Sequence, residues 1–313
     1  MSKTAFLFPG QGAQYAGMGR ELTEAYPAAR RVFQEADEAL GFALSRLCFE
    51  GPAEELQLTV NAQPAILTTA VACLAVLREK GVPAGAAAGH SLGEYGALVA
   101  AGTLSFADAV RVVRQRGRFM QEAVPPGAGG MTAVLGLDAP AVEEICRRAG
   151  GAGVVEAVNL NCPGQVVIAG DTAALERAAA LAKKAGARRL VPLAVSAPFH
   201  SSLMRPAGEK LAAVLADVPV AGLQFPVVAN VTADYVRAPE EVRQLLVRQV
   251  YSPVRWEESM RRLLADGVEL FVEMGPGTVL TGLLRKIDRR AACLPAGEPG
   301  GLEKVLAYHG EVG

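Results

Sequence analysis

The sequence contains few of the residues that mark several large classes of protein. Its 313 residues include only three histidines, one tryptophan and five cysteines, and aromatic side chains make up 5% of the chain. The cysteines are odd in number and form no C-x-x-C pair, and no two histidines have the spacing of metal ligands. These absences argue against a disulfide framework and against a zinc site. We therefore expect small, buried thiols in a reduced compartment.

Strong charge and long apolar runs are also lacking. A formal net charge of -1 offers no basic surface for nucleic acid or anionic membranes, and no apolar run approaches the length of a membrane span. Met1-Ser2-Lys3 leads directly into a strand pattern, without a signal-peptide core or cleavage pattern. We expect a soluble cytoplasmic protein without nucleic-acid or membrane partners, long enough for one large domain and a smaller one.

The chain alternates between strand-like and helix-like runs, which indicates an α/β fold with a largely parallel sheet. The expected strands include Thr4–Phe8, 84–88, 227–231 and 269–273, and the expected helices include 28–40, 62–78 and 240–249.

A stretch rich in proline and glycine, Val124 to Gly130, is the clearest linker. After it, the patterns predict strand 131–137, helix 140–149, strand 154–161, strand 165–169, helix 172–185 and strand 189–195. That is the β-α-β-β-α-β order of a ferredoxin-like unit. We therefore predict a parallel-sheet domain formed by residues 1–126 and 196–313, an inserted subdomain at 127–195, and a substrate cleft between them.

The most informative motif is Gly89-His90-Ser91-Leu92-Gly93, which lies between an alanine-rich run and a helical pattern. It matches G-x-S-x-G, the strand-to-helix turn that exposes a nucleophilic serine. The new helix would offer unpaired N–H groups and positive partial charge where an oxyanion forms. The alternative is a glycine-rich turn with a solvated serine.

A serine nucleophile needs a base, and the chain offers three histidines. His90 adjoins Ser91 and should point away from it, while His309 lies in a polar C-terminal segment of a kind that is often mobile. His200 follows the last strand of the inserted subdomain, where the chain returns across the cleft, so we predict that it is the base. No acid stands out to orient it, since Asp171 fits a helix N-cap better, and a backbone carbonyl is the alternative.

An arginine lies on the apolar face of the helix that follows. Ser105 is the expected N-cap, and the helix should run to about residue 121. Its apolar stripe consists of Ala109, Val112, Val113 and Met120. Arg116 falls within that stripe, and a buried guanidinium is costly without an anionic partner. The partner is either an internal acid such as Glu94 or Glu273, or a substrate carboxylate held by two parallel hydrogen bonds.

The loop Phe8-Pro9-Gly10-Gln11-Gly12-Ala13-Gln14 follows the first strand. It is not a dinucleotide loop, because Tyr15 replaces the third glycine of G-x-G-x-x-G and no ribose-binding acid follows. The loop should lie at the same end of the sheet as the elbow. Its backbone N–H groups could therefore complete an oxyanion hole with that of Leu92.

Taken together, these segments resemble the malonyl-CoA:acyl carrier protein transacylase family over nearly the whole chain. The matching blocks are Phe8–Gln14, Gln63–Ala65, Gly89–Glu94, Arg116–Arg118, Asn161–Ile168, Phe199–His200, Gln249–Val254 and Glu273–Gly277. The part after about Leu294 is the least similar. The resemblance implies an α/β-hydrolase-like large domain with an inserted ferredoxin-like subdomain.

The resemblance also implies roles for individual residues. Ser91 would be the nucleophile and His200 the base. The backbone N–H groups of Gln11 and Leu92 would form the oxyanion hole. The backbone carbonyl of Gln249 would orient the histidine in place of an acid, and no catalytic position departs from the family pattern.

The implied activity is malonyl transfer from malonyl-CoA to the phosphopantetheine thiol of acyl carrier protein. Arg116 would hold the malonyl carboxylate, and Phe199 matches the malonyl-selective members. We expect ping-pong kinetics without a metal or cofactor, in fatty-acid or polyketide synthesis. The alternatives are an acyl-enzyme hydrolase, a transferase for another acyl group, and a non-catalytic docking subunit of a synthase complex.

Overall fold

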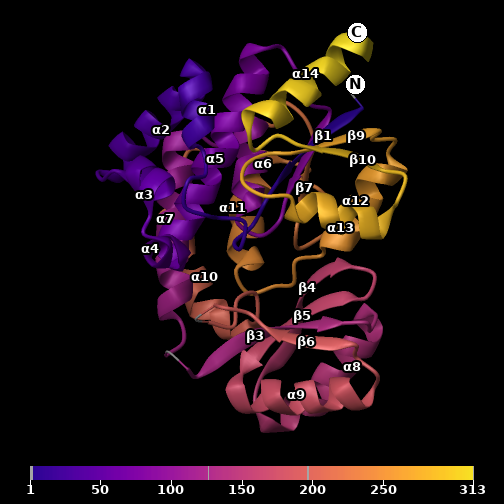
Figure 1. The fold of residues 1–313 in the computed structure, drawn as a ribbon. Coiled ribbons are helices and arrows are strands. Elements are labelled where there is room, and N and C mark those ends of the chain that lie inside the picture. The colour runs from indigo at the N-terminus through magenta and orange to yellow at the C-terminus, as the bar shows by residue number, and fades with distance from the viewer. Residues whose placement is uncertain (1–2, 126, 196, 313) are drawn as a thin grey trace.

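Two sheets organise the protein. The computed structural model describes residues 3–125, 127–195 and 197–312. Figure 1 shows a larger unit that carries both ends of the chain and, below it, a smaller unit built from the middle of the sequence. This is the mixed α/β architecture that the sequence predicts. The proposed domain limits at 126 and 196 fall on residues outside the described part of the chain, so that division stays a prediction.

The larger sheet has the strand order β10-β9-β1-β2-β7-β8. Its strands are β1 (Thr4–Phe8), β2 (Ala86–Gly89), β7 (Val227–Ala229), β8 (Asp234–Tyr235), β9 (Leu270–Glu273) and β10 (Ala292–Pro295). Every pairing is parallel except that of β8 at the edge. The sheet's four central strands are fully buried, as expected when helices cover both faces.

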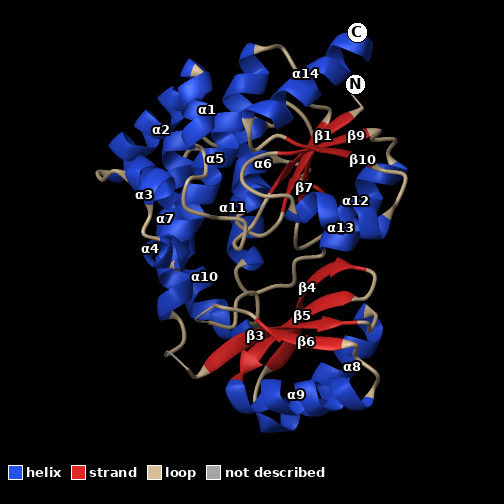
Figure 2. Ribbon diagram, in the orientation of Figure 1, coloured by secondary structure: helices blue, strands red, loops and turns tan. Residues whose placement is uncertain are grey.

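Helices cover both faces of this sheet (Figure 2). They are α1 (Arg20–Ala25), α2 (Pro27–Leu40), α3 (Leu44–Glu50), α4 (Ala53–Gln57), α5 (Thr59–Glu79), α6 (Gly93–Ala100), α7 (Phe106–Glu122), η2 (Ser202–Met204), α10 (Arg205–Ala216), α11 (Pro239–Gln249), α12 (Trp256–Ala265), α13 (Val279–Ile287) and α14 (Pro299–Val312). Side chains alternate along β1: Phe6 and Phe8 join the core formed with α5 and α7, while Ala5 and Leu7 join the core formed with α12 and α13.

The smaller sheet is antiparallel, with the order β4-β5-β3-β6. It contains β3 (Gly129–Leu135), β4 (Val155–Cys162), β5 (Gln165–Asp171) and β6 (Arg189–Pro192), with α8 (Ala139–Ala149), η1 (Gly150–Ala152) and α9 (Thr172–Lys184) between them. The β-α-β-β-α-β order is therefore confirmed. One face packs on α8 and α9, whereas Met131, Ala133 and Val167 on the other face join the main core.

Some expected boundaries were wrong. Gly129 and Gly130, assigned to the linker, belong to β3, where a Cβ on Gly129 would lie 2.9 Å from the Gly170 carbonyl oxygen. The predicted strand 189–195 ends early, at Pro192. Asp171 does precede α9, but its side chain accepts a hydrogen bond from the Val154 N–H (2.7 Å) instead of capping the helix.

The C-terminal segment that contains His309 is packed against the larger unit. It forms β10, which extends the large sheet, and α14, whose Leu302 and Val305 are buried. Within the described residues, α5 is the one helix long and apolar enough to cross a membrane. Because 83% of its most apolar window is buried inside the fold, α5 is the central helix of the main core.

Candidate active site

The turn at Ser91 is held in a strained conformation by its glycine neighbours. Ser91 has a φ of 52°, in the left-handed region that side chains rarely adopt. A Cβ on Gly93 would lie 2.0 Å from the Phe8 carbonyl oxygen, and one on Gly89 would lie 1.9 Å from the Gly93 carbonyl carbon. These close approaches need glycine and press the turn against the loop after β1. This is the geometry of a nucleophile elbow at the carboxyl ends of β1 and β2.

His200 lies beside this serine. Its Nε2 is 2.7 Å from Ser91 Oγ, and its Nδ1 is 2.7 Å from the backbone oxygen of Gln249. Because a carbonyl oxygen can only accept, Nδ1 carries the hydrogen and Nε2 presents its lone pair to the serine hydroxyl. The histidine is thus oriented by a backbone carbonyl group. This is the alternative to an acid that the sequence had left open.

The imidazole of His200 is held neutral. The side chain is 3% exposed, and burial, reinforced by the positive charge of Arg116, lowers its pKa to about 3. Both causes disfavour the imidazolium form, so the free site keeps an unprotonated Nε2 throughout the neutral range.

Side chains from distant elements hold the backbone of Ser91. Asn230, which follows β7, accepts a hydrogen bond from the Ser91 N–H through Oδ1 (2.7 Å) and donates one from Nδ2 to the Gly89 carbonyl (2.6 Å). The side-chain amide of Gln249, at the end of α11, donates to the Ser91 carbonyl (2.8 Å). Sequence reasoning missed both roles, because each depends on elements that lie more than 130 residues from the elbow.

Arg116 is buried as its place in the apolar stripe predicts, with 1% of the residue exposed. Its Nη1 donates to Gln63 Oε1 (2.8 Å), and its Nη2 donates to Gln249 Oε1 (2.9 Å) and Ser91 Oγ (3.1 Å). Its Nε has no partner among the described residues. The guanidinium therefore lies against the serine hydroxyl with one N–H still unused.

Neither acid proposed as the internal partner of Arg116 makes an ion pair with it. Glu273 accepts hydrogen bonds from the Leu280 and Thr281 N–H groups at the start of α13 (both 2.8 Å). Glu94 accepts from the Asn230 N–H (3.0 Å) and from Gln249 Nε2 (2.7 Å). Among the described residues, no carboxylate lies within 4.0 Å of the guanidinium nitrogens.

The structure brings the two residues predicted for the oxyanion hole to one place. Gln11 and Leu92 both line the pocket that contains Ser91 and His200. In the part of the chain that the structure describes, no backbone hydrogen bond is donated by the N–H of either residue. Both donors are therefore available to an oxygen atom that enters the pocket.

The pocket itself is a narrow cavity of about 80 Å³ between the two units. Apolar side chains from the smaller unit and its return segment close it, namely Met131, Leu193, Val195 and Phe199. The larger unit supplies the polar groups around the serine. Small size and one buried cation favour a short acyl group with a negative charge.

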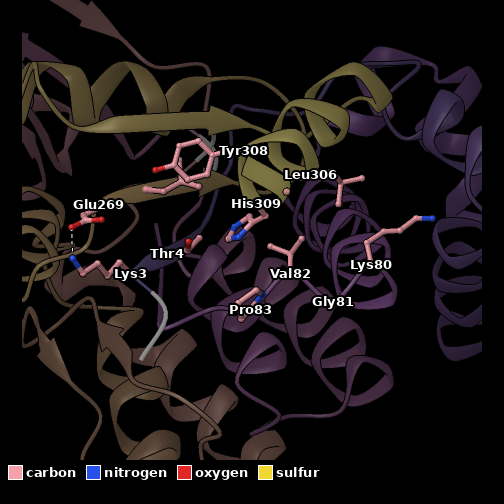
Figure 3. A pocket seen from close by; sticks show the side chains of 12 residues that line it. Lys3, Thr4, Lys80, Gly81, Val82, Pro83, Glu269, Leu306, Tyr308 and His309 are labelled. Carbon is pink, nitrogen blue, oxygen red and sulfur yellow. Dashed lines mark hydrogen bonds and ion pairs between the residues drawn. The ribbon is translucent and has the colours of Figure 1, made fainter. Parts of the chain in front are cut away.

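The other two histidines lie away from the serine. His90 bonds through Nε2 to Asn161 Oδ1 (2.8 Å) and packs on Trp256, so its predicted structural role fits. His309 lines a larger cavity, of about 680 Å³, at the amino ends of β1 and β9 (Figure 3). The elbow lies at the carboxyl ends of the strands. This cavity is therefore at the opposite end of the sheet from the serine.

A cationic surface lies where the smaller unit meets α13. Its exposed cations are Arg188, Arg189, Arg285, Lys286 and Arg289. None of them forms an ion pair with a described acidic residue. The turn Pro163–Gly164 lines the same surface and follows Asn161, the partner of His90, by two residues. The surface therefore begins two residues along the chain from a side chain that contacts the elbow.

The described residues contain no group of three or more histidine, cysteine, aspartate or glutamate side chains placed to hold a metal ion. The five cysteines are all buried and free, as predicted.

Known proteins are similar to this chain both in sequence and in fold. Residues 5–295 match the family described as "Acyl transferase domain". Over 307 residues the chain is 53% identical to the malonyl CoA-acyl carrier protein transacylase of Bacillus subtilis (strain 168), covering 98% of this chain and 97% of the relative. It is 48% identical, also over 307 residues, to the protein of that name from Escherichia coli (strain K12), covering 98% of this chain and 99% of the relative.

Solved structures give the same result. An acyl carrier protein S-malonyltransferase from Vibrio cholerae matches with a TM-score of 0.95 and 45% identity, covering 97% of this chain and 100% of that chain. A malonyl-transacylase in complex with a holo type II PKS acyl-carrier protein matches with a TM-score of 0.96 and 45% identity, covering 98% of this chain and 100% of that chain.

Proposed function

Because this chain belongs to the acyl transferase family, and within it to the malonyl CoA-acyl carrier protein transacylases, we propose that it transfers a malonyl group from malonyl-CoA to acyl carrier protein. The observation that carries the proposal is the position of Ser91 Oγ, which lies 2.7 Å from His200 Nε2 and 3.1 Å from Arg116 Nη2. A base and a carboxylate-binding cation meet at one hydroxyl.

In the first step, Ser91 Oγ attacks the thioester carbonyl carbon of malonyl-CoA, and its proton passes to His200 Nε2. The carbonyl oxygen becomes an oxyanion that accepts hydrogen bonds from the Gln11 and Leu92 N–H groups. Each such donor is worth about 3 kcal/mol of transition-state stabilisation. The negative charge also favours the imidazolium that forms beside it. Collapse breaks the C–S bond, His200 returns the proton to the CoA sulfur, and a malonyl ester remains on Ser91.

Arg116 selects the acyl group in this scheme. Its unused Nε N–H and its Nη2 N–H form a planar fork, and a carboxylate can accept from two parallel donors of that kind. In the free enzyme, Nη2 donates a hydrogen bond to Ser91 Oγ. When that oxygen is esterified, the same N–H group becomes available to the substrate carboxylate. A neutral acyl chain would leave the buried Nε N–H without a partner.

The second step reverses the first with a different thiol. The phosphopantetheine thiol of acyl carrier protein attacks the malonyl ester and gives its proton to His200. Collapse of the second tetrahedral intermediate breaks the bond to Ser91 Oγ, which regains a proton from His200. Two thiols use one site in turn, so the kinetics are ping-pong.

The cationic surface gives both substrates a place to bind. CoA and phosphopantetheine each carry phosphate groups at the far end of the arm that bears the thiol. Arginine side chains are suited to phosphate recognition, and five cations that form no ion pair with a described acidic residue raise the local concentration of an anionic partner. We infer that the carrier protein and the CoA phosphates use this surface.

The reaction, the compartment and the domain organisation complete the description of the enzyme. Every proton and bond in the two steps is handled by Ser91, His200 and the substrate thiols, so the scheme needs no metal or organic cofactor. We place the enzyme in the cytoplasm, in fatty-acid or polyketide synthesis. We assign residues 1–126 and 196–313 to the catalytic domain and 127–195 to the inserted subdomain.

Intact-mass measurement after rapid mixing with malonyl-CoA tests the proposal. The expected result is one malonyl adduct on the wild-type chain, removed on addition of holo acyl carrier protein, and no adduct on Ser91→Ala. An adduct that persists in Ser91→Ala, or one that carrier protein fails to remove, would contradict the scheme.

A further inference from the structure

Glu94 is connected to Arg116 through the side-chain amide of Gln249. Glu94 Oε2 accepts a hydrogen bond from Gln249 Nε2 (2.7 Å), and Gln249 Oε1 accepts one from Arg116 Nη2 (2.9 Å). All three side chains are buried, with 1%, 0% and 1% of each residue exposed for Glu94, Gln249 and Arg116. The carboxylate and the guanidinium therefore lie at the two ends of one oriented amide dipole, in a medium that screens charge weakly.

We propose that Glu94 is a positioning residue for the substrate carboxylate: it is the resident counter-ion of Arg116 in the free enzyme, and it takes up a proton when malonyl occupies the guanidinium. The inference rests on the proposed function, because it needs a carboxylated acyl group at Arg116. One buried cation would then face one negative charge before binding and one after it.

The hydrogen bonds of Glu94 leave room for this proton. Both of the bonds that it accepts from described residues, from the Asn230 N–H and from Gln249 Nε2, end on Oε2. Oε1 can carry a proton while Oε2 keeps both bonds. Protonation would therefore change the charge of the network without releasing Gln249, which also holds the Ser91 carbonyl.

The charges around Glu94 favour such an exchange. The charged or titratable groups that interact with it are Arg116 on α7 and Tyr95 beside it on α6, and Arg116 in turn interacts with the imidazole of His200. Burial raises the pKa of Glu94 to about 7, while hydrogen bonds and the positive charge of Arg116 oppose the rise. A substrate carboxylate that neutralises Arg116 removes that opposition, so the pKa of Glu94 rises further on binding.

Linkage fixes the sign and size of the effect. Binding raises the pKa of Glu94, so binding takes up a proton wherever the free carboxyl is ionised. With a free-enzyme pKa of about 7, uptake is small at pH 6 and grows with pH, to at most about half a proton at pH 7 and at most about 0.9 proton at pH 8. The affinity for malonyl-CoA then falls between pH 7 and pH 8, by up to about fivefold.

The test is calorimetric titration of the Ser91→Ala variant, which binds malonyl-CoA without acylation. Heats measured in two buffers of different ionisation enthalpy give the number of protons taken up. Acetyl-CoA is the matched ligand, because it carries the same titratable phosphates and no carboxylate. We expect the stated uptake with malonyl-CoA beyond that seen with acetyl-CoA, and none of this excess in Ser91→Ala/Glu94→Gln.

Glutamine at position 94 keeps an oxygen acceptor for Asn230 and Gln249, so the double variant removes the titrating group with little change of shape. Excess uptake that is zero between pH 6 and pH 8, or that survives in the Glu94→Gln background, would overturn the inference. In the second case the proton belongs to His200. If malonyl-CoA binds no more tightly than acetyl-CoA, the proposed carboxylate role of Arg116 fails instead. The single variant's pH dependence stands as a test even if the double variant does not fold.

Discussion

At the scale of single residues, Gln249 connects the two parts of the chemistry. Its backbone carbonyl orients His200, while its side-chain amide contacts Arg116, Glu94 and the Ser91 carbonyl. The base and the carboxylate site therefore share one support. A substitution at this position would disturb both, so the separate contributions are better measured at His200 and Arg116 themselves.

Replacement of Arg116 should separate malonyl transfer from transfer of a neutral acyl group. Loss of two hydrogen bonds to a carboxylate costs about 3 kcal/mol, or about a hundredfold in kcat/KM for malonyl-CoA. Arg116→Ala should show this loss, with a much smaller effect on acetyl-CoA. Arg116→Lys should recover little, because an ammonium group is a point charge and cannot form the fork. Equal losses for both acyl donors would refute the carboxylate role.

His200 should remain an effective base at mildly acidic pH. Its pKa is lowered to about 3, so its neutral form persists well below the usual range of histidine. A neutral sulfonyl fluoride reports Ser91 reactivity without involving a substrate carboxylate. The rate of Ser91 sulfonylation should stay nearly constant from pH 7.5 to pH 5, and it should be far lower in His200→Ala. A rate that falls with an apparent pKa near 6.5 would show that the imidazole is not held neutral.

The predictability of the site follows from how local each signal is. The elbow around Ser91 is a local motif, and the burial of Arg116 follows from helical periodicity, so both could be found in the sequence. Which of the two candidate acids lies nearer to Arg116 could not be found from the sequence. Glu94 and Glu273 were equal candidates, because only the tertiary structure places Glu273 at the start of α13 and Glu94 behind Gln249.

At the scale of secondary-structure elements, strong patterns located most of the core. The strand at Thr4–Phe8 and the helix 28–40 were predicted within one residue. Short edge elements carried too little pattern: β8 has two residues and β10 has four, and neither was predicted. Ladder pairing decides such strands, and the sequence alone does not contain that information.

The packing of α6 against β1 should make Gly93 irreplaceable. A Cβ there would lie 2.0 Å from the Phe8 carbonyl oxygen, and backbone cannot move aside as a flexible side chain can. We expect Gly93→Ala to lower the free energy of unfolding by about 3 kcal/mol or more. Gly282→Ala is the matched control, because a Cβ inside α13 at that position meets nothing within 4 Å.

The control should be neutral or should stabilise the protein by about 0.5–1 kcal/mol, since alanine favours helix over glycine. Urea denaturation of the two variants beside wild type measures both effects. Similar stability for Gly93→Ala and Gly282→Ala would mean that the elbow is not held by this close approach.

At the scale of the whole molecule, the junction between the two units should set how the carrier protein binds. The net charge of the chain is only -1, yet five cations without an ion pair to a described acidic residue gather where the smaller unit meets α13. The double charge reversal Arg189→Glu/Arg285→Glu should raise the KM for acyl carrier protein about three- to tenfold, because exposed charges act mainly on association. The rate of Ser91 sulfonylation should not change, since neither arginine lines the serine pocket.

Steady-state transfer assays at several salt concentrations measure this effect. Raising the ionic strength should weaken carrier-protein use by the wild type more than by the double variant, because salt screens only the attraction that the cations supply. Arg148→Glu/Arg177→Glu, on α8 and α9, makes the same change of net charge away from this surface and is the control. Equal increases in KM for the two double variants would assign the effect to net charge and not to the surface at α13.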